Sequence, residues 1–311
     1  MSVARLATAA LLALLAPLAL GPVALAAQDT TRTEVRGRRL DADGAVRIWN
    51  LLGSVRVVGW ARDSIAVTAR VAAGAPLYFG GGGQGVKLGV EERGGSAATA
   101  DLEVRVPRGA RVWIKTSTAT IAVTGVAGDL ELYSVTGAVR VTGRPATLRV
   151  ESMAGAVTVS DGADWIRART SSGALTVRGA VGDAGLSTVG GALALDGAVA
   201  QRARLESVTG TVTHRGSVAR GATLANETNA GDVTLQRLQP GGDVALDLLT
   251  LTGKITSPVP GVRAAVRAGK QGQSLLLPAG KGAGGDEGRL EVRSFRGAIV
   301  VEAAGDRRKP R

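Results

Sequence analysis

A repeat of 18 residues runs through the middle of the sequence and constrains its fold more than any other feature. Its regular copies open at positions separated by steps of 18, which are Ala119, Gly137, Gly155, Gly173 and Gly191. Further copies open after steps of 19, 21 and 22 residues, at Gly210, Gly231 and Gly253. A fixed period near 20 residues is typical of a solenoid, in which each repeat forms one rung stacked on the next.

Within each copy, apolar and polar residues alternate twice. In the copy that opens at Gly137, Val139 and Val141 form one apolar pair, and Leu148 and Val150 form another that begins nine residues later. Alternation with period two predicts strands with one buried face. We therefore predict an all-β, single-stranded parallel β-solenoid with two main facing sheets. A third, short side formed by one of the turns stays open. The six-residue apolar spacing of a left-handed hexapeptide helix is absent.

Glycines mark the predicted corners of each rung. Besides the opening glycines, a second set recurs six residues later: Gly125, Gly143, Gly179, Gly197 and Gly216. Glycine adopts a positive φ without steric cost, so both sets are predicted to form tight turns.

The region before the repeats, residues 27–110, is predicted to form an N-terminal β cap and a first rung. It lacks the period but contains five strand-like segments, at residues 45–49, 54–58, 64–71, 86–91 and 101–106. An open solenoid end exposes unpaired strand edges, which a cap would cover. Gly80–Gly83 and Gly94-Gly95 are expected to form flexible loops.

Residues 111–302 are assigned to the solenoid. The rung pattern returns near the end of the chain, from Leu290 to Val301, and it is expected to form the last rung. The 44 residues between Gly253 and Gly297 leave room for one degenerate rung before it. Residues 303–311 are predicted to be a basic, disordered tail.

The first 26 residues are predicted to be a cleaved export signal. Arg5 precedes an uncharged stretch, Leu6–Leu20, and Ala24-Leu25-Ala26 has the small-x-small form of a cleavage site. An uncleaved anchor is the alternative, although Pro17 and Pro22 interrupt the stretch. No other segment approaches the ~20 apolar residues of a membrane span. We therefore expect an exported protein in the periplasm, at the cell surface or secreted.

The composition excludes several kinds of chemistry. The chain has no cysteine, so disulfides, thiolate catalysis and cysteine-ligated metals are ruled out. Its formal net charge of +12 favours acidic partners, such as envelope polymers or glycans. The arginines are spread over many rungs instead of forming one block, and we do not expect nucleic acid as a partner.

A column of hydroxyl residues precedes the opening positions by three residues. Its members are Thr116, Ser134, Ser152, Thr170, Thr188, Ser207, Thr228 and Thr250. Since no base or metal ligand accompanies them, we expect a structural role, in which they bond to corner backbone groups and to each other.

His214 is the only histidine in the chain. It stands where other rungs place valine or leucine, and Asn226 occupies the matching site of the other strand. A catalytic or metal-bound histidine needs partners that the sequence lacks. We predict a buried histidine, hydrogen-bonded to Asn226 or to a water. No cofactor or metal is expected.

Two weaker motifs carry no function of their own. The glycine-rich run Gly80–Gly85 lacks the Lys-Ser/Thr of a phosphate-binding loop. The run Gly241–Asp247 resembles a calcium-binding nonapeptide, but the corners of the other rungs lack the aspartates that such a site requires.

Three features resemble a known family. They are the opening Val46–Trp60, the junction Leu102–Ala110 and the repeated Ser/Thr-x-x-Gly-x-Val-x-Val of the rungs. Together, over about residues 35–302, they resemble the exported DUF4097 family of adhesin-type β-strand repeat proteins. The resemblance implies a β-solenoid outside the cytoplasm, and it brings no catalytic or ligand residues.

The leading hypothesis is a non-enzymatic, adhesin-like envelope scaffold or binding module. Its ligand-contact surface is expected at Arg167, Arg169, Arg202 and Arg204. The alternatives are a polysaccharide-active β-helix enzyme on acidic glycans and a periplasmic component of an envelope signalling system. Carboxylates converging in a groove beside these arginines would favour the enzyme, and a flat, purely basic face would favour binding.

Overall fold

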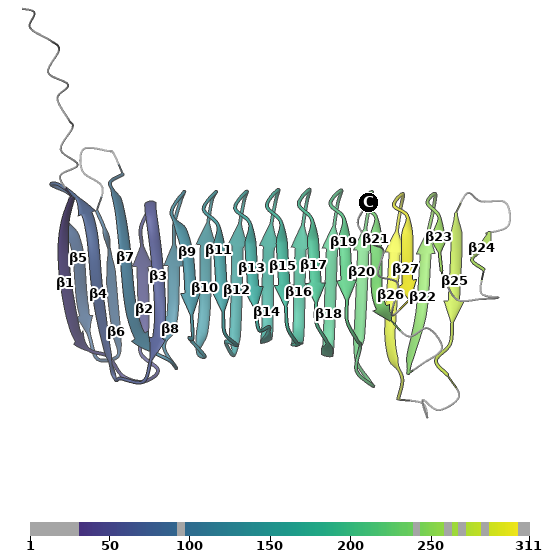
Figure 1. Ribbon diagram of the computed structural model, residues 1–311, viewed down its shortest axis with the longest axis horizontal. Coiled ribbons are helices and arrows are strands. Elements are labelled where there is room, and N and C mark those ends of the chain that lie inside the picture. The colour runs from purple at the N-terminus through teal and green to yellow at the C-terminus, as the bar shows by residue number, and fades with distance from the viewer. Residues whose placement is uncertain are drawn as a thin grey trace, which may run out of the picture. The chain divides into compact units, whose positions relative to one another are not determined.

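The computed structural model describes residues 31–91, 97–238, 243–257, 263–266, 272–280 and 286–303, which belong to one compact unit. Three expected features lie outside the described residues. They are the signal peptide, the Gly94-Gly95 pair and the basic tail after its first residue. Every regular element described is a β-strand, and the strands form two sheets, of 13 strands (sheet A) and 14 strands (sheet B) (Figure 1). The predicted all-β solenoid is thereby confirmed.

Each central rung gives one strand to each sheet. Sheet B receives β8 (Arg111–Lys115), β10 (Asp129–Ser134), β12 (Thr147–Ser152), β14 (Ala163–Thr170), β16 (Val181–Thr188), β18 (Val199–Ser207) and β20 (Thr223–Thr228). Sheet A receives β9 (Thr120–Thr124), β11 (Val139–Thr142), β13 (Val157–Ser160), β15 (Leu175–Arg178), β17 (Leu193–Asp196), β19 (Val212–Arg215) and β21 (Val233–Leu238). Within each set, neighbouring strands are parallel and lie side by side in chain order. The described residues form no third sheet.

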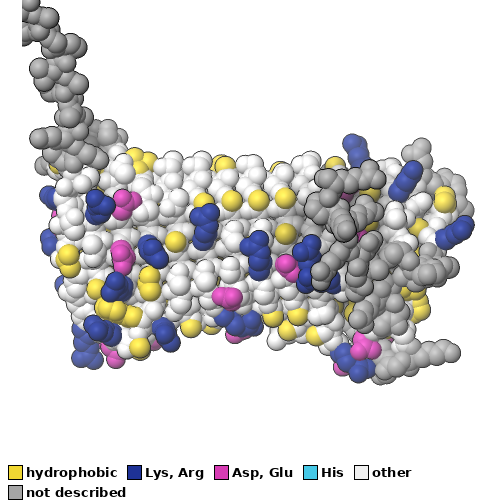
Figure 2. Space-filling model, in the orientation of Figure 1, with side chains coloured by type: hydrophobic (Ala, Val, Ile, Leu, Met, Phe, Trp, Pro, Cys, Tyr) yellow, Lys and Arg dark blue, Asp and Glu magenta, His cyan; other side chains and the backbone are white. Residues whose placement is uncertain are grey.

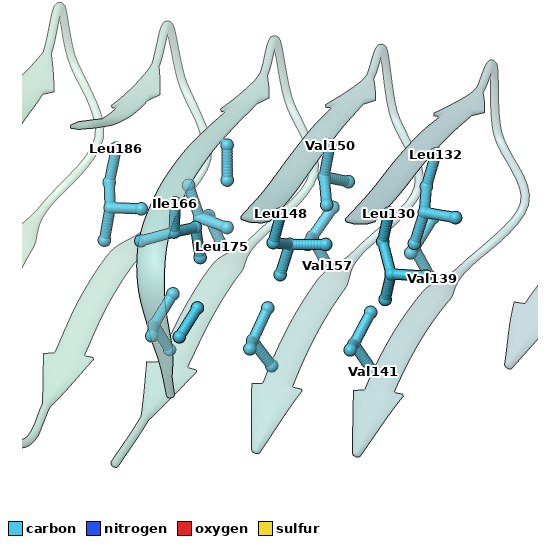
Figure 3. Packing of buried hydrophobic residues seen from close by; sticks show 14 of the residues in the cluster. Leu130, Leu132, Val139, Val141, Leu148, Val150, Val157, Ile166, Leu175 and Leu186 are labelled. Atoms are coloured by element: carbon cyan, nitrogen blue, oxygen red, sulfur yellow. The ribbon is translucent and has the colours of Figure 1, made fainter. Parts of the chain in front are cut away.

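The 18-residue period of the sequence sets the register in which neighbouring strands pair. Leu130 pairs with Leu148, which pairs with Ile166, and all three are fully buried between the two sheets (Figure 3). Val139 and Val157 form the matching column of sheet A. Burying an aliphatic side chain of this size contributes about 1.5–3 kcal/mol. Each rung therefore stabilises the fold only when a neighbouring rung stacks on it.

The glycines of the two corner sets are needed for two different reasons. At Gly173 an added Cβ would lie 2.2 Å from the carbonyl oxygen of Gly155, and at Gly191 it would lie 2.1 Å from that of Gly173. The opening glycines and Gly197 do not have the positive φ that we predicted. They are glycines because successive corners stack too closely for a side chain. Positive φ is found in the second set, at Gly125, Gly143, Gly179 and Gly216.

The N-terminal end begins with a rung, β2 (Ala45–Trp49) and β3 (Leu52–Trp60), stacked on β8 and β9. A second rung, β6 (Gly85–Val90) and β7 (Thr99–Pro107), stacks on its outer side in parallel. Antiparallel strands then cover both sheets: β5 (Leu77–Gly82) in sheet B, and β4 (Ser64–Ala72) and β1 (Thr31–Arg39) in sheet A. Gly80–Gly82 belong to β5, so the flexible loop expected at Gly80–Gly83 was wrong, because these glycines pair with β6.

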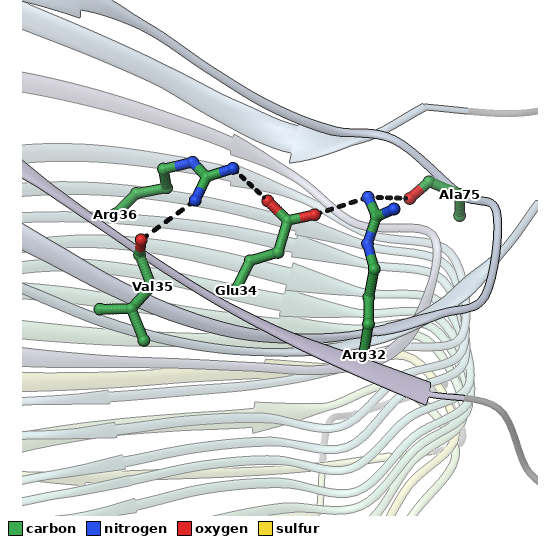
Figure 4. A network of polar contacts seen from close by, with 5 residues as sticks. All are labelled: Arg32, Glu34, Val35, Arg36 and Ala75. Atoms are coloured by element: carbon green, nitrogen blue, oxygen red, sulfur yellow. Dashed lines mark hydrogen bonds and ion pairs between the residues drawn. The ribbon is translucent and has the colours of Figure 1, made fainter.

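The outermost strand of sheet A, β1, carries alternating charges. Glu34 forms ion pairs with Arg32 at 2.5 Å and with Arg36 at 2.6 Å, and Arg32 donates a hydrogen bond to the carbonyl oxygen of Ala75 (Figure 4). Charged side chains on an edge strand disfavour pairing with another chain. The sequence analysis did not predict this strand.

The C-terminal end departs from chain order. After β21 the chain forms β22 (Val244–Thr250) and β23 (Ile255–Thr256), and then β24 (Ala265–Val266) and β25 (Gln273–Leu277), which add antiparallel strands beyond β22. It then returns with β26 (Gly288–Ser294) and β27 (Ile299–Ala303). β26 lies between β20 and β22, and β27 lies between β21 and β23 (Figure 1). The last rung in sequence is therefore inserted, and the expectation that it ends the stack is wrong.

Candidate functional site

The hydroxyl column tethers the corners. Its eight members are buried, and so is Ser294 of the inserted rung. Five donate a hydrogen bond to the carbonyl oxygen of the opening glycine three residues later in the chain: Ser134 at 2.8 Å, Ser152 at 2.9 Å, Thr170 at 2.7 Å, Ser207 at 2.7 Å and Thr228 at 3.1 Å. Thr188 instead accepts the N–H of Gly191 at 3.0 Å and lies 3.1 Å from the Thr170 hydroxyl. These hydroxyls are engaged by the backbone and by each other.

His214 and Asn226 are both buried, but they do not bond to each other. In the described part of the chain, no side-chain nitrogen or oxygen of either residue has a hydrogen-bond partner. The predicted His214–Asn226 bond is therefore wrong, and each residue is flanked by aliphatic neighbours in its own sheet. The alternative, a bond from His214 to a water, stays a prediction. Burial lowers the pKa of His214 to about 4, and the nearby Leu195 backbone and Asp196 only partly oppose this shift.

The predicted arginines lie on the outer face of sheet B. Arg167 and Arg169 belong to β14, and Arg204 belongs to β18, with β16 between them. Gly185 of β16 pairs with Arg167 on one side and with Arg204 on the other. Gly185 has no side chain, and the Arg167 side chain lies over it, so that an added Cβ would be 2.7 Å from Arg167 Cδ. The face around these residues is hollowed to a volume of about 330 Å³. We call this depression the arginine hollow.

The lining of the arginine hollow carries a net positive charge. Its charged and aromatic members are Arg149, Arg167, Arg169, Arg204, Glu151, Glu206 and Trp165. Arg202, the fourth predicted arginine, lies one column away, in register with Asp183, and does not line the hollow. The sequence analysis missed Arg149 and Trp165. Arg149 precedes Arg167 by one period of 18 residues, and this spacing was the available signal.

Two of the arginines are held in place. The Arg167 guanidinium lies 4.5 Å from the ring centroid of Trp165 and 2.9 Å from the Asp183 carboxylate. Arg204 pairs with Glu206 on its own strand, and with Glu227 at 3.0 Å. Such cation–π and ion-pair contacts pre-orient the cations.

The other two arginines, Arg149 and Arg169, have no carboxylate partner among the described residues. Arg149 lies 6.0 Å from the Trp165 ring, and neither Arg149 nor Arg169 forms an ion pair with any described residue. The hollow therefore offers two uncommitted guanidinium groups to an incoming anion.

The carboxylates of the hollow do not form a catalytic pair. Glu151 stands on β12 and Glu206 on β18, three strand spacings apart, or about 14 Å along the sheet. Glycoside-hydrolysing pairs lie about 5–9.5 Å apart. No group of three or more potential metal ligands occurs among the described residues. Beside the hollow, Glu206 of β18 and Glu227 of β20 stand in register on neighbouring strands, and both pair with Arg204. The face is thus not flat and purely basic, and the two acids that do converge are tied to one arginine.

Basic side chains are dispersed elsewhere. On the face drawn in Figure 2, lysine and arginine side chains stand singly or in small groups, between acidic and apolar ones. A continuous basic strip, as expected for a backbone-tracking nucleic-acid groove, is not seen on that face. The described residues include no helix that could cross a membrane.

Comparison with known proteins adds likenesses of fold at low identity. No protein-family model matches the chain, and no curated protein matches it. A solved structure named as a putative adhesin, from Parabacteroides merdae, has a TM-score of 0.48 and 9% identity, covering 87% of this chain and 96% of that one. One named as a putative lipid binding protein, from Parabacteroides distasonis, has a TM-score of 0.47 and 10% identity, with the same coverage. One named as a putative cell adhesion protein, from Clostridium sporogenes, has a TM-score of 0.28 and 9% identity, covering 87% and 98%. No residue role is carried over from these likenesses.

Proposed function

We propose that this protein is an exported, non-enzymatic binding module that holds acidic groups of an envelope polymer or glycan in the arginine hollow. The observation that carries this proposal is the pair of uncommitted guanidinium groups, Arg149 and Arg169, beside the half-buried Trp165–Arg167 stack. Arginine binds carboxylates and phosphates through two parallel hydrogen bonds, and an aromatic ring packs against the face of a sugar.

The arrangement supports binding better than catalysis. Glu151 and Glu206 of the hollow stand about 14 Å apart by strand spacing. Glu206 and Glu227 lie on neighbouring strands, but both are ion-paired with Arg204. A catalytic acid and base must both be free to reach one scissile bond, and these two carboxylates are held by the arginine. The adhesin-like role implied by the family resemblance, and the location in the cell envelope, belong to the same proposal.

The test measures binding of the purified mature protein to a polyuronate and to the matched neutral polysaccharide, at low and high salt. The double variant Arg149→Gln/Arg169→Gln should weaken polyuronate binding at least about tenfold, because charged hydrogen bonds are worth about 1.5–3 kcal/mol each. Neither arginine has an ion-pair partner among the described residues, so the exchange leaves no carboxylate unpaired there.

The matched control is Arg140→Gln/Arg178→Gln, two exposed arginines on the opposite sheet. It removes two positive charges without touching the hollow, and it should leave binding within about twofold of the wild type. Equal losses in both variants, together with disappearance of binding at high salt, would show that only net charge attracts the polymer and would overturn the proposal.

A further inference from the structure

A second concave feature runs beside the arginine hollow. It is an open groove of about 1100 Å³ that crosses the strands of sheet B at their C-terminal ends. Nine neighbouring strands line it, β8, β10, β12, β14, β16, β18, β20, β26 and β22, so it extends over about 38 Å at ~4.8 Å per strand. The rung period creates this groove, since each rung repeats the same three positions along it.

One wall of the groove is largely apolar. It is formed by the residues that follow the hydroxyls of the column, and six of them are large and apolar: Val135, Met153, Val189, Val208, Leu251 and Phe295. Ser171 and Asn229 interrupt this row. Met153 is 60% exposed and Val189 is 53% exposed. Of the nine large hydrophobic residues exposed among the described residues, five line this groove. Exposed apolar side chains gathered in this way mark a binding surface.

The floor of the groove has few hydrogen bonds left to offer. It is the column of buried hydroxyls, and these are bonded to the corner backbone, as Ser152 is to Gly155 at 2.9 Å and Thr170 is to Gly173 at 2.7 Å. A polar ligand would find few partners along this floor, whereas a hydrocarbon chain needs none.

The other wall links the groove to the arginine hollow. Glu151, Arg169, Ser187 and Glu206 line both features. Arg169 forms no ion pair with any described residue, so its charge is available at the boundary between the two. The charged residues that line the groove are Lys115, Arg169, Arg293, Glu151, Glu206 and Glu227. Glu206 and Glu227 are paired with Arg204, and Arg293 is paired with Asp247, which leaves the Arg169 guanidinium open to an anion. A long groove with one apolar wall and this cation at its side complements a ligand that has one extended alkyl chain and one anionic head.

We propose that the groove binds a long-chain fatty acid, with its alkyl chain along the apolar wall and its carboxylate at Arg169. The proposal shares Arg169 with the polymer site but does not depend on polymer binding. Each fully buried methylene is worth about 0.8 kcal/mol. In an open groove that buries about half of the chain surface, each methylene should tighten binding about twofold.

The experiment titrates the purified mature protein with hexadecanoate, dodecanoate and hexadecanoate methyl ester, each below its micelle concentration. Hexadecanoate should bind about fifteenfold more tightly than dodecanoate, which has four fewer methylenes. Arg169→Gln should weaken hexadecanoate binding but leave binding of the uncharged ester within about twofold, because the ester offers no anion to the guanidinium.

The groove variant is Met153→Gln/Val189→Gln, and its control is Val35→Gln, an apolar residue 68% exposed on β1. The groove variant should weaken hexadecanoate binding about tenfold or more, while the control stays within about twofold. Both exchanges lie on exposed positions, and unchanged melting temperatures would verify that the fold is intact.

Three outcomes would overturn the proposal. They are affinity that does not depend on chain length, equal losses in the groove variant and the control, and no binding of monomeric hexadecanoate. If the groove variant instead changes the sedimentation of the ligand-free protein, the groove is a contact between two copies, and the fatty-acid proposal fails. Since the polyuronate test does not use Met153 or Val189, either proposal can fail while the other stands.

Discussion

The central rungs and the C-terminal rungs have the same sequence pattern but differ in how they are ordered. From β8 to β21, each strand pairs with the strand one repeat away in the chain. At the C-terminal end, β26 and β27 enter between rungs that precede them, and Ala298 bonds to Asp232 across 66 residues. The comparison teaches that the alternating pattern specifies a rung but not the neighbours of that rung.

The out-of-order insertion costs little free energy. Each doubling of loop length adds about 0.6 kcal/mol of closure entropy, so a span of 66 residues instead of 18 adds about 1 kcal/mol. The inserted rung buries Leu290, Val292, Ile299 and Val301, and a single such side chain is worth more than that cost. The extra distance along the chain therefore does not prevent the insertion.

The largest effect is expected where corners touch. Gly191→Ala should destabilise the protein by about 4 kcal/mol, because its Cβ would lie 2.1 Å from the Gly173 carbonyl oxygen. Gly190→Ala is the matched control, since its Cβ would lie 3.6 Å or more from other atoms. Denaturant unfolding measures both.

The corner of the inserted rung offers the corresponding test. Gly297→Ala would place a Cβ 2.0 Å from the Gly231 carbonyl oxygen. A loss as large as that of Gly191→Ala would show that the same corner geometry applies out of chain order. Tolerance of Gly297→Ala would mean that the inserted rung is held more loosely than the central ones.

Shortening one buried side chain in each region should loosen the strands that lie next to it in the sheet. Leu290→Ala should cost about 3 kcal/mol and accelerate amide hydrogen exchange in β20 and β22, on both sides of the inserted β26. Leu130→Ala should do the same in β8 and β12. Faster exchange spread evenly over all rungs after either exchange would contradict coupling between nearest neighbours.

His214 makes the last regularly ordered rungs sensitive to acid. Its folded pKa of about 4 lies below the ordinary value of 6.5, so the unfolded chain binds the proton more tightly. Stability should therefore fall as the pH drops from about 6.5 towards 4, by about 2 kcal/mol at a pH of about 5 relative to a pH of about 8.

Two leucine variants separate the effect of protonating His214 from the cost of burying an unpaired polar side chain. His214→Leu should remove the acid sensitivity and preserve or raise stability at neutral pH, since Leu195 and Leu235 flank the position. Asn226→Leu should raise stability at every pH and leave the acid sensitivity unchanged. Unfolding curves over this pH range check both, and an acid response that persists in His214→Leu would refute the assignment.

The smallest effect concerns an ion pair that joins the inserted β26 to β22. Arg293 binds both carboxylate oxygens of Asp247, at 2.9 and 2.6 Å, and this lowers the pKa of Asp247. Both side chains are 41% exposed, so Arg293→Gln should cost only about 0.5 kcal/mol at neutral pH. The difference should vanish as the pH falls through the lowered pKa.

The central region supplies the matched pair, Arg144 and Asp164, at 2.6 Å. Arg144→Gln should cost a similar amount or less, since its aspartate is more exposed. Chemical denaturation of both variants compares the two regions, and a much larger loss for Arg293→Gln would make the ion pair essential to the insertion.

The periodic part of the fold could be predicted from the sequence because one residue pattern sets both strand and register there. The predicted strand at residues 45–49 coincides with β2. Alternation could not reveal β1, which is largely exposed, or the Gly80–Gly82 stretch of β5, where glycine carries no pattern. It also could not place the inserted rung, because Leu290 and Ile299 would fit any slot in the stack.

The candidate site was predictable only in part. Arg167, Arg169 and Arg204 were identified as an outer face. The glycine that lets the Arg167 side chain lie across the next strand, Gly185, has a role that is apparent only once its strand neighbours are known. The apolar wall of the groove had a readable signal. It was the apolar residue after most hydroxyls of the column, as at Met153 and Val189, which becomes apparent when the repeats are aligned.

The inserted rung makes completion of the stack depend on the last strands of the chain. When only the strands up to β23 are in place, each sheet has a gap one strand wide, flanked by β20 and β22 or by β21 and β23. The unpaired edges on both sides of that gap would be ready to accept a strand from another molecule. A second copy carries the same β26 and β27, so two molecules that have lost or not yet placed these strands could exchange them. Once they are placed, β26 and β27 cover the edges at which two copies of the chain would otherwise pair.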